Sequence, residues 1–357
     1  MIQENIKYTQ QAGVFKFNRL NCLRNEYFHN DCKECINICS HEAFEFIRNK
    51  LYINELKCTF CGSCLGVCPS EALSLCDFEP NEFIQNFSKK DEKLLSCNIN
   101  IPCLNSFDIH HFIYLGVFKN SCDFDISSCK ECEHNKNGKV LENIEKNISI
   151  AKEFLKELEK EPTFELKTDV KIKAKREIIK QFVNKVIDKD GENVKDNLKT
   201  HESKSTPLKL KLLKSALKTL LDVHEGIKIA NPYNFYSNKS IVFEKCTNCA
   251  ECIQFCPTGA LSHSGDKLSI FFQIGKCINC NICSDICKPK AFEDINGFDI
   301  LEFAYDKARV LIKHEIAVCT ECKAPFSYKG GKKICDRCID FTQNYDHFFK
   351  TAAELEG

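Results

Sequence analysis

Apolar residues occur along the chain in short segments, and no apolar run approaches the roughly 18 residues of a membrane-spanning helix. Residues 178–187 and 210–221 have apolar positions at the helical period, so each segment is predicted to form a helix with one apolar face. The polar stretch 188–207 between them is expected to be a flexible loop. The apolar positions are Ile178, Ile179, Phe182, Val183, Val186 and Ile187 in the first helix and Leu210, Leu213, Ala216, Leu217, Leu220 and Leu221 in the second.

Between residues 94 and 135 the pattern changes to strand, helix and strand. An apolar strand ends at Cys97, a helix follows, and a second strand ends near Cys129. Two histidines of the helix, His110 and His111, are expected on its surface. The β-α-β order predicts a small parallel sheet, and open α/β units place their sites at one edge of such a sheet. Four cysteines would gather there: Cys97, Cys103, Cys129 and Cys132.

Composition makes cysteine the dominant feature. The 357 residues include 26 cysteines, no tryptophan and one methionine, which indicates a disulfide scaffold or a metal protein. The first twenty residues have neither an apolar signal core nor a twin arginine, so a cytoplasmic protein with reduced thiols is expected. A metal protein is therefore favoured over disulfides. The formal net charge of zero counts every thiol as neutral, and bound clusters would make the protein acidic.

A spacing repeat organises most of these thiols. CTNCAECIQFCP begins at Cys246 and is followed by CINCNICSDICKP at Cys277, while CKECINICS begins at Cys32 and is followed by CTFCGSCLGVCP at Cys58. Three cysteines two residues apart can surround one corner of an iron–sulfur cube, and a fourth beyond them can reach a second cube. Disulfides or an array of zinc sites are the alternatives, but they do not explain why this spacing recurs.

Both regions resemble bacterial two-cluster [4Fe–4S] ferredoxin domains over about 60 residues at each end of the chain. The resemblance implies α+β domains and interleaved ligand sets. In the C-terminal domain the implied sets are Cys246, Cys249, Cys252 and Cys287, and Cys277, Cys280, Cys283 and Cys256. In the N-terminal domain one implied set is Cys58, Cys61, Cys64 and Cys39.

The remaining N-terminal set departs from the family pattern. Cys32, Cys35 and Cys68 are in place, but the usual first ligand is absent, and Ser40 replaces the usual proline after Cys39. The nearest upstream thiol is Cys22. A looped-out insertion could return Cys22 to the cube, and the alternatives are a three-iron cluster or an empty site.

Two C-x₂-C pairs joined through a Gly-Gly turn occur near the C-terminus, and they predict a zinc ribbon. A rubredoxin-like iron site is the alternative, but Lys323 and Ile339 stand where rubredoxin knuckles have glycine. His314 is expected on the surface rather than as a ligand. The four metal ligands would be Cys319, Cys322, Cys335 and Cys338.

The β-α-β module resembles the cysteine-bearing α/β module of hydrogenase delta subunits, which implies an additional iron–sulfur cluster at Cys97, Cys103, Cys129 and Cys132. The spacing alone also allows zinc or no metal. Cys76 and Cys122 belong to no such group and are expected to be packed thiols.

The cysteine-free segment from Leu141 to Leu221 is expected to be a basic helical linker. Between Lys171 and Lys218 fourteen Lys and Arg residues face six Asp and Glu residues, a local net charge of +8. It could be a solvated spacer, a surface for an acidic redox partner, or a nucleic-acid contact. Nucleic acid is the least favoured, because no aromatic residues interleave with the lysines.

The expected α+β architecture comprises a dicluster ferredoxin domain (1–80), a small α/β module (81–140), a helical linker (141–230), a second dicluster domain (231–300) and a zinc-ribbon module (301–345). No dinucleotide fingerprint, phosphate-binding loop or catalytic triad pattern occurs, so no substrate site of its own is identified. The pattern predicts an iron–sulfur electron-transfer protein that relays electrons between a redox enzyme subunit and an acceptor, and the resemblance implies a partner of the formate dehydrogenase or hydrogenase type. The alternative is a cluster-containing assembly or regulatory factor that binds a client protein or nucleic acid.

Overall fold

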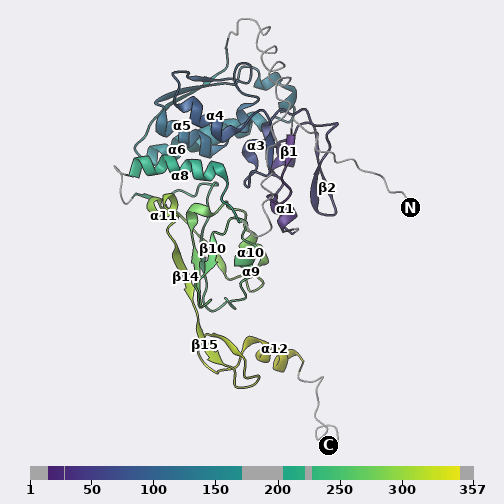
Figure 1. Cartoon of the computed structure of the whole chain (residues 1–357), viewed down its shortest axis with the longest axis vertical. Helices are drawn as coiled ribbons and strands as arrows, with labels where there is room; N and C mark the ends of the chain where they lie inside the picture. The colour runs from purple at the N-terminus through teal and green to yellow at the C-terminus, as the bar shows by residue number, and fades with distance from the viewer. Residues whose placement is uncertain (1–14, 28, 171–203, 222–226, 346–357) are drawn as a thin grey trace, which may run out of the picture.

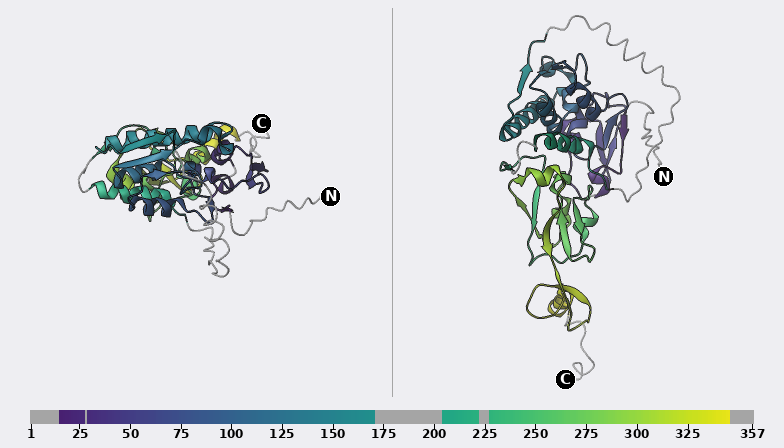
Figure 2. Two further views of the ribbon diagram at one scale, coloured as in Figure 1. Left: turned by 90° about the horizontal axis from the view of Figure 1, so that it is seen from above. Right: turned by 60° about the vertical axis from the view of Figure 1, so that its left-hand side comes forward.

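The computed structural model describes residues 15–27, 29–170, 204–221 and 227–345. These residues form an elongated molecule, with the N-terminal and middle parts at one end and a small hairpin at the other (Figure 1). A second view shows the same succession (Figure 2). The helix predicted over 178–187 and most of the predicted loop 188–207 lie outside the described residues.

The N-terminal unit is built from two small antiparallel sheets and three short helices. The strand before the first cysteine of the repeat pairs with the strand after its last cysteine, and a hairpin lies between them. The short helices follow the cysteine loops. The elements are β1 (Phe15–Phe17) paired with β4 (Leu73–Leu75), β2 (Phe44–Ile47) paired with β3 (Lys50–Ile53), and α1 (Leu23–Glu26), α2 (Glu34–Ile38) and α3 (Ser63–Val67).

The C-terminal unit repeats this topology and extends it. The strand before its first cysteine again pairs with the strand after its last cysteine, and its internal hairpin gains a third antiparallel strand. The elements are β8 (Lys228–Ile229) paired with β13 (Phe298–Asp299), β9 (Asn238–Ile241) paired with β12 (Phe292–Ile295), the sheet of β10 (Leu261–His263), β11 (Ser269–Phe272) and β14 (Arg309–Lys313), and the helices α9 (Glu251–Gln254), η4 (Ile274–Lys276), α10 (Ile282–Ile286) and α11 (Ile300–Ala304).

The middle module confirms the predicted β-α-β order and adds a third strand. Its sheet has the order β5-β6-β7, with both pairs parallel. The central helix α5 is buried from Ile109 to Gly116 and packs against α4, α6 and α8. The elements are α4 (Pro80–Ser88), β5 (Leu94–Leu95), η1 (Leu104–Ser106), α5 (Ile109–Phe118), β6 (Ser121–Asp125), η2 (Cys129–Glu131), η3 (Glu133–Asn135), α6 (Lys139–Glu157) and β7 (Thr163–Lys167).

The segment expected as a linker over 141–230 is in part core structure. Helix α6 buries Ile144, Ile148 and Phe154, and β7 completes the sheet of the middle module. The predicted helix over 210–221 is confirmed as α8 (Leu208–Leu221), and all of its predicted apolar positions are buried. A solvated spacer is therefore the wrong description of α8, because its apolar face packs on α5.

The expected boundary at residue 301 also differs from the structure, because β14 belongs to the sheet of the C-terminal unit. The terminal hairpin follows it and consists of β15 (Glu315–Val318) paired with β16 (Pro325–Tyr328), and α12 (Asp336–Asn344). None of the described helices is long and apolar enough to cross a bilayer.

Candidate metal centres

Site 1 is defined as Cys22, Cys32, Cys35 and Cys68, and the structure brings these four thiols together. Cys22 directly precedes α1, Cys35 lies in α2, and Cys68 ends α3. All four line one small cavity, together with Pro69 and Leu73. The longer stretch of chain between Cys22 and Cys32 is thus folded back, so that Cys22 occupies the fourth position.

The thiols of site 1 oppose one another's ionisation. Burial is the largest cause that raises the pKa of the Cys35 thiol, and Cys68, Cys32 and Cys22 raise it further. The pKa of Cys32 is raised to about 11, first by burial, although the backbone N–H of Glu34 opposes that rise. The backbone N–H of Ala72 donates to Cys68 Sγ at 3.2 Å. Four thiolates are stable in this place only if a cationic group compensates them.

Site 2 is defined as Cys39, Cys58, Cys61 and Cys64, and it adjoins site 1. Burial raises the pKa of Cys64 well above its ordinary value, and the next largest causes are Cys61, Cys35, Cys58 and Cys39. Three of these belong to site 2, whereas Cys35 belongs to site 1. The two N-terminal sites therefore lie side by side with interleaved cysteines.

Three of the cysteine loops share a backbone conformation that explains their sequence. The residues two and four positions after the first cysteine have positive φ, as in Phe60 (54°) and Gly62 (75°). Successive backbone N–H groups in such a turn point into the concavity of the loop. The residues with positive φ in the other two loops are Asn248 and Ala250, and Asn279 and Asn281. The corresponding loop of site 1 has no such residue among those described.

Site 3 is defined as Cys97, Cys103, Cys129 and Cys132, and the structure gathers it at one edge of the middle module. Burial raises the pKa of Cys103 most; the N–H of Asn105 lowers it, and Cys61, Cys97 and Cys129 raise it. The pKa of Cys129 is raised to about 12, by burial and then by Cys97 and Cys132. Because Cys61 contributes at Cys103, site 3 adjoins site 2.

Ser40 connects sites 2 and 3 and explains one departure from the family pattern. Its hydroxyl donates to the carbonyl oxygen of His134 at 2.9 Å, two residues beyond Cys132. His41 Nε2 lies 2.8 Å from His134 Nδ1. A proline at position 40 would lack the hydroxyl, so the serine belongs to the contact with the middle module.

Sites 4 and 5 lie together in the C-terminal unit. The four cysteines of site 4 line one small cavity, together with Pro289 and Ala291. The backbone N–H of Ala291 donates to Cys287 Sγ at 3.3 Å. The pKa of Cys252 is raised to about 12 by burial, then by Cys283 of site 5 and by its own site. Site 4 is defined as Cys246, Cys249, Cys252 and Cys287, and site 5 as Cys256, Cys277, Cys280 and Cys283.

The hairpin site, Cys319, Cys322, Cys335 and Cys338, has a different geometry. Its four sulfur atoms all lie within 4.8 Å of one another, and no other group of three or more potential ligands in the described parts of the chain is as tight. Cys319 is buried, which opposes ionisation, but backbone N–H groups, led by that of Cys335, lower its pKa to about 6. Lys323 has a φ of 58°, the conformation that the usual knuckle glycine favours.

Asn30 joins the two cysteine-rich units. Its Nδ2 donates to the carbonyl oxygen of Cys280 in site 5 at 3.1 Å, and its Oδ1 accepts from the backbone N–H of Cys32 in site 1 at 3.1 Å. The side chain is 3% exposed. Nearby, the rings of Tyr27 and Phe255 lie 5.6 Å apart. Site 1 and site 5 therefore face each other across the boundary between the units.

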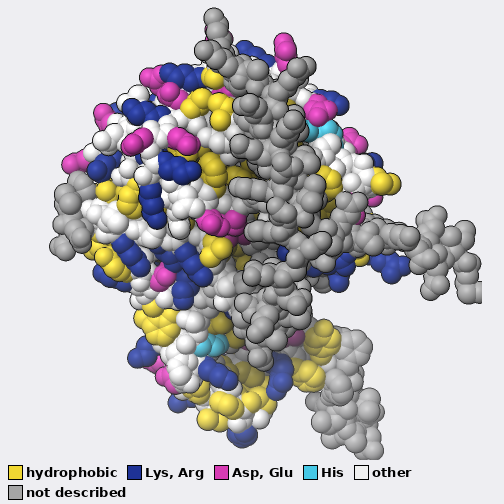
Figure 3. Space-filling model, turned by 45° about the horizontal axis from the view of Figure 1, so that its top comes forward, with side chains coloured by type: hydrophobic (Ala, Val, Ile, Leu, Met, Phe, Trp, Pro, Cys, Tyr) yellow, Lys and Arg dark blue, Asp and Glu magenta, His cyan; other side chains and the backbone are white. Residues whose placement is uncertain are grey.

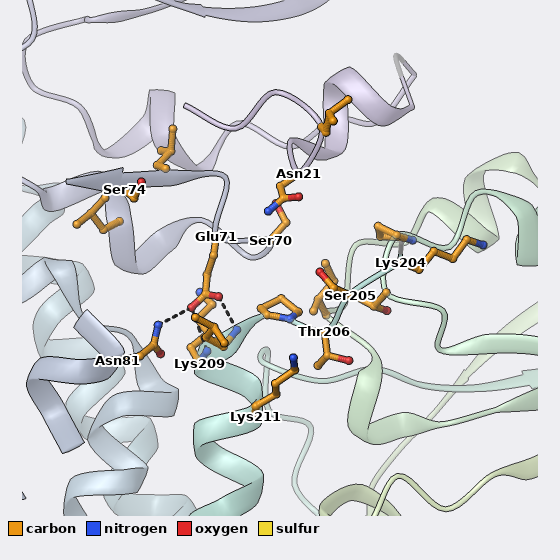
Figure 4. A pocket seen from close by; sticks show the side chains of 18 of the residues that line it. Asn21, Ser70, Glu71, Ser74, Asn81, Lys204, Ser205, Thr206, Lys209 and Lys211 are labelled. Carbon is orange, nitrogen blue, oxygen red and sulfur yellow. Dashed lines mark hydrogen bonds between the residues drawn. The ribbon is translucent and has the colours of Figure 1, made fainter. Parts of the chain in front are cut away.

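A pocket of about 870 Å³ opens beside this boundary, between the N-terminal unit, the start of α8 and the C-terminal unit. Glu71 extends from the N-terminal unit toward Lys209 and Asn81, as Figure 4 shows. Its carboxylate accepts from the backbone N–H of Lys209 at 3.0 Å and from Asn81 Nδ2 at 3.0 Å. Glu71 thereby satisfies the first backbone donors of α8.

Several buried charges beside the sites were not identified from the sequence. Lys209 is 4% exposed; it donates to the carbonyl oxygen of Gly66 in α3 at 2.9 Å and pairs with Asp108 at 2.5 Å. Lys239 is 2% exposed and donates to Asn281 Oδ1 in the loop of site 5 at 2.9 Å. Arg24 is 6% exposed. In a chain with 50 Lys and Arg residues, no sequence signal separates these buried charges from the exposed ones.

Some expectations for individual residues were wrong. His110 and His111 are buried, because both pack around the Asp108 carboxylate at the start of α5. His314 is 1% exposed. Of the two cysteines expected to be packed, Cys122 is buried within β6, whereas Cys76 is exposed.

Two family models match the chain. Residues 30–72 and residues 238–288 each match the model of a 4Fe-4S dicluster domain. These matches define an iron–sulfur protein with two dicluster domains, and the described cysteine groups fall within them except for Cys22, site 3 and the hairpin site. Such domains are those of an iron–sulfur electron-transfer protein.

The chain belongs to the ferredoxin family. A ferredoxin of Methanothermococcus thermolithotrophicus is 41% identical over 46 residues, which is 13% of this chain and 77% of that relative. An uncharacterised ferredoxin of Methanocaldococcus jannaschii is 39% identical over 46 residues, 13% of this chain and 74% of the relative. Another from the same organism is 36% identical over 47 residues, 13% of this chain and only 32% of its own length.

The donor sets fit iron–sulfur clusters. Sites 1, 2, 4 and 5 each offer four sulfur atoms, and in sites 1 and 4 the four cysteines line one cavity. Backbone N–H groups point at several of these sulfurs, as they do in iron–sulfur sites generally. Their raised pKa values keep these thiols protonated near neutral pH, so a bound cationic group is needed to hold them there as thiolates.

Proposed function

We propose that this protein relays electrons between a redox enzyme subunit and an acceptor, through sites that follow one another in the order 3, 2, 1, 5 and 4. A bound [4Fe–4S] cluster supplies a one-electron couple whose potential depends on nearby charge and hydrogen bonds. The observation that carries the proposal is the pair of Asn30 hydrogen bonds to Cys32 and Cys280. They make the two dicluster domains neighbours at the level of their ligand loops.

Site 3 belongs to this relay as a fifth cluster site. A zinc ion holds thiolates at about 2.3 Å, which brings four sulfurs as close together as they are in the hairpin site. The thiols of site 3 do not form such a tight group, and neither do those of sites 1, 2, 4 and 5. The backbone N–H of Asn105, two residues after Cys103, bonds that cysteine and lowers its pKa. The N–H of Asn279, two residues after Cys277, does the same in site 5, so the loop of site 3 resembles that of a cluster site in this respect.

The hairpin site is proposed to hold zinc in a structural role. Four sulfurs from two knuckles form a closed set, and Cys322 Sγ lies 3.7 Å from Cys335 Sγ. Burial is the largest effect on the pKa of Cys246 and raises it, whereas the charge of Lys329 in the hairpin lowers it. The hairpin therefore lies near site 4. The hairpin would therefore present a partner surface at that end of the relay.

The partner class rests on family resemblance. Formate dehydrogenases, hydrogenases and related enzymes use polyferredoxin subunits, and we propose a partner of that kind in the cytoplasm. The alternative role as a client-binding or nucleic-acid-binding factor has less support, because Lys209 and Lys214 of the basic segment are buried in ion pairs. On the face in Figure 3, basic and acidic side chains are interspersed over the described surface.

Metal analysis of the anaerobically purified protein tests the proposal first. Five clusters and one zinc predict about 20 irons, about 20 sulfides and one zinc per chain. Reduction followed by EPR should then be reversible. Iron well below eight per chain, or clusters that decompose on reduction, would remove the relay and favour the assembly-factor alternative.

The step between the domains is tested with Asn30→Ala. The variant loses both hydrogen bonds that join Cys32 to Cys280, so electrons introduced at the N-terminal sites should reach sites 5 and 4 more slowly. Rapid-freeze EPR after mixing with a reductant measures this transfer. Asn86→Ala, at an exposed position of α4 away from the ligand loops, is the matched control. Equal transfer rates in Asn30→Ala and the wild type would contradict a path across this boundary.

A further inference from the structure

Arg24 carries a positive charge into site 1, and no carboxylate in the described parts of the chain forms an ion pair with it. It follows Cys22 by two residues, is 6% exposed, and lines the cavity that the four cysteines of site 1 share. Its Nε and Nη1 are buried and have no hydrogen-bond partner among the described residues. The guanidinium lies over the ring of Phe46, at 3.9 Å from the ring centroid.

An arginine with two buried, unpartnered donors is rare, because each unsatisfied polar group carries a desolvation penalty of about 1–3 kcal/mol, more when charged. The cation–π contact with Phe46 compensates only the face of the guanidinium. The N–H groups lie in its plane and require an acceptor. Besides the Ser70 hydroxyl and the Glu34 carboxylate, neither of which bonds these two nitrogens, the acceptors in this cavity are the sulfur atoms of site 1 and of the group that they bind.

Sites 2 and 3 have a different electrostatic environment. The charge acting on Cys58 of site 2 is that of Glu55, and the charges acting on Cys129 of site 3 are those of Asp125 and Glu145. At site 1 the carboxylate of Glu34 acts on Cys32 and lines the same cavity, but Glu34 is exposed and screened by water. Lys209 adds a second buried cation near Cys68, although Asp108 pairs with it.

We propose that Arg24 donates to sulfur in site 1 and makes site 1 the most oxidising of sites 1, 2 and 3. The inference rests on the proposed relay and specifies its direction. Hydrogen bonds to sulfur and positive charge both favour the reduced, more negative state of a cluster and so raise its potential. An electron that enters the N-terminal sites then settles at site 1, which faces site 5 across Asn30.

EPR-monitored redox titration of the full-length protein tests this assignment. Arg24→Met removes the charge and the donors but keeps an apolar stem over Phe46, and Arg24→Gln removes the charge but keeps an amide donor. In both variants the potential of site 1 should fall by at least the equivalent of a tenfold change in its equilibrium constant, about 59 mV for one electron. Arg24→Lys keeps the charge and should restore most of the wild-type potential.

The control is Arg19→Met, since Arg19 also lies over an aromatic ring, that of Tyr52, at 5.2 Å, but is exposed. The site 1 signal is identified as the one missing from Cys22→Ala. If Arg24→Met loses iron, Arg24→Gln decides the result. A variant with full iron and an unchanged site 1 potential would overturn the proposal. A wild-type protein without any reversible couple would instead contradict the relay itself.

Discussion

Every thiol in sites 1 to 5 that shows a resolved shift has a raised pKa, with burial as its largest cause. In the hairpin site the pKa of Cys319 is lowered to about 6 and that of Cys322 is lowered as well, whereas that of Cys338 is raised to about 12. The two kinds of site therefore differ in how many protons metal binding displaces.

This difference predicts opposite pH sensitivities between pH 7 and 9. Thiols with pKa values of 11 to 12, such as Cys32 and Cys277, are protonated in the metal-free sites, so each bound thiolate displaces about one proton and binding strengthens as pH rises. Cys319 is already ionised above pH 6. Iron release to a chelator should therefore slow steeply with rising pH, while zinc release changes less. Equal slopes for the two metals would contradict this account.

Cys22 supplies the second prediction at this scale. Cys22→Ala should lose one cluster, about four irons per chain, because Cys22 lines the cavity of site 1 with the three other thiols. Cys76→Ala is the control, since Cys76 is exposed and belongs to no group. Iron analysis and EPR measure the loss. Unchanged iron and spectra in Cys22→Ala would favour the three-cysteine alternative for this site.

For individual residues, sequence spacing was sufficient for the cysteines and insufficient for their surroundings. The C-x₂-C-x₂-C-x₃-C spacing identifies ligands because it is local, and even the displaced Cys22 could be found as the nearest upstream thiol. Arg24, Asn30 and Lys239 act across distances that no local pattern encodes. The histidines beside Asp108 were misplaced for the same reason, since their burial depends on α8.

Among the elements, helix α3 lies unusually close to the η1 turn of the middle module. A Cβ at Gly66 would lie 2.4 Å from the carbonyl oxygen of Phe107 and 2.6 Å from that of Asn105. Backbone atoms cannot move aside as a side chain can. The contact between site 2 and site 3 therefore depends on a residue without a side chain.

Gly66→Ala should destabilise the protein by about 1–3 kcal/mol through overpacking. The measurement is thermal unfolding of the cluster-loaded protein followed by circular dichroism. Gly265→Ala is the matched control, because nothing lies within 4 Å of its added Cβ. A melting temperature of Gly66→Ala equal to that of the control would show that α3 and η1 can separate without loss.

Periodicity predicted the elements that have one buried apolar face and failed for a strand that is mostly exposed. Helix α8 was predicted from its pattern, and its predicted face is buried. The role of α8 was not predicted, because a basic helix with one apolar face can serve as a spacer as well as pack in a core. Strand β7 is exposed at three of its five positions and pairs only at one edge, so its sequence gave little strand signal.

On the scale of the whole molecule, Lys209 ties three parts together. It extends from α8, pairs with Asp108 at the start of α5, and donates to Gly66 in α3. Burial opposes the charge of Lys209, but Asp108 and Glu71 raise its pKa. The pair is buried on both sides, so removal of one partner leaves an uncompensated charge.

Lys209→Met should therefore lower the free energy of unfolding by about 3–5 kcal/mol. The double variant Lys209→Met with Asp108→Asn should recover part of that loss, because the stranded carboxylate is gone. Lys211→Met, an exposed lysine on the same helix, should be neutral. Chemical denaturation of the four proteins measures the series. A neutral Lys209→Met would mean that water reaches Asp108.

The order of the sites was beyond the reach of the sequence. A long cysteine-free segment separates the two dicluster domains, and such a segment permits either contact or separation. The contact depends on the packing of α8 on α5 and on the side chain of Asn30, which are both tertiary features.

The late position of α8 in the chain has a consequence for biogenesis. Domains fold in order as a chain leaves the ribosome, and all twelve cysteines of sites 1, 2 and 3 precede α8. Assembly factors can therefore deliver iron and sulfide to these sites before Lys209 docks against α3. Once α8 is in place, Lys209 holds α3, the helix that carries Cys64 and precedes Cys68, so we expect replacement of a cluster lost to oxygen to require local opening of this contact. We expect damaged molecules to be renewed by synthesis more readily than by repair.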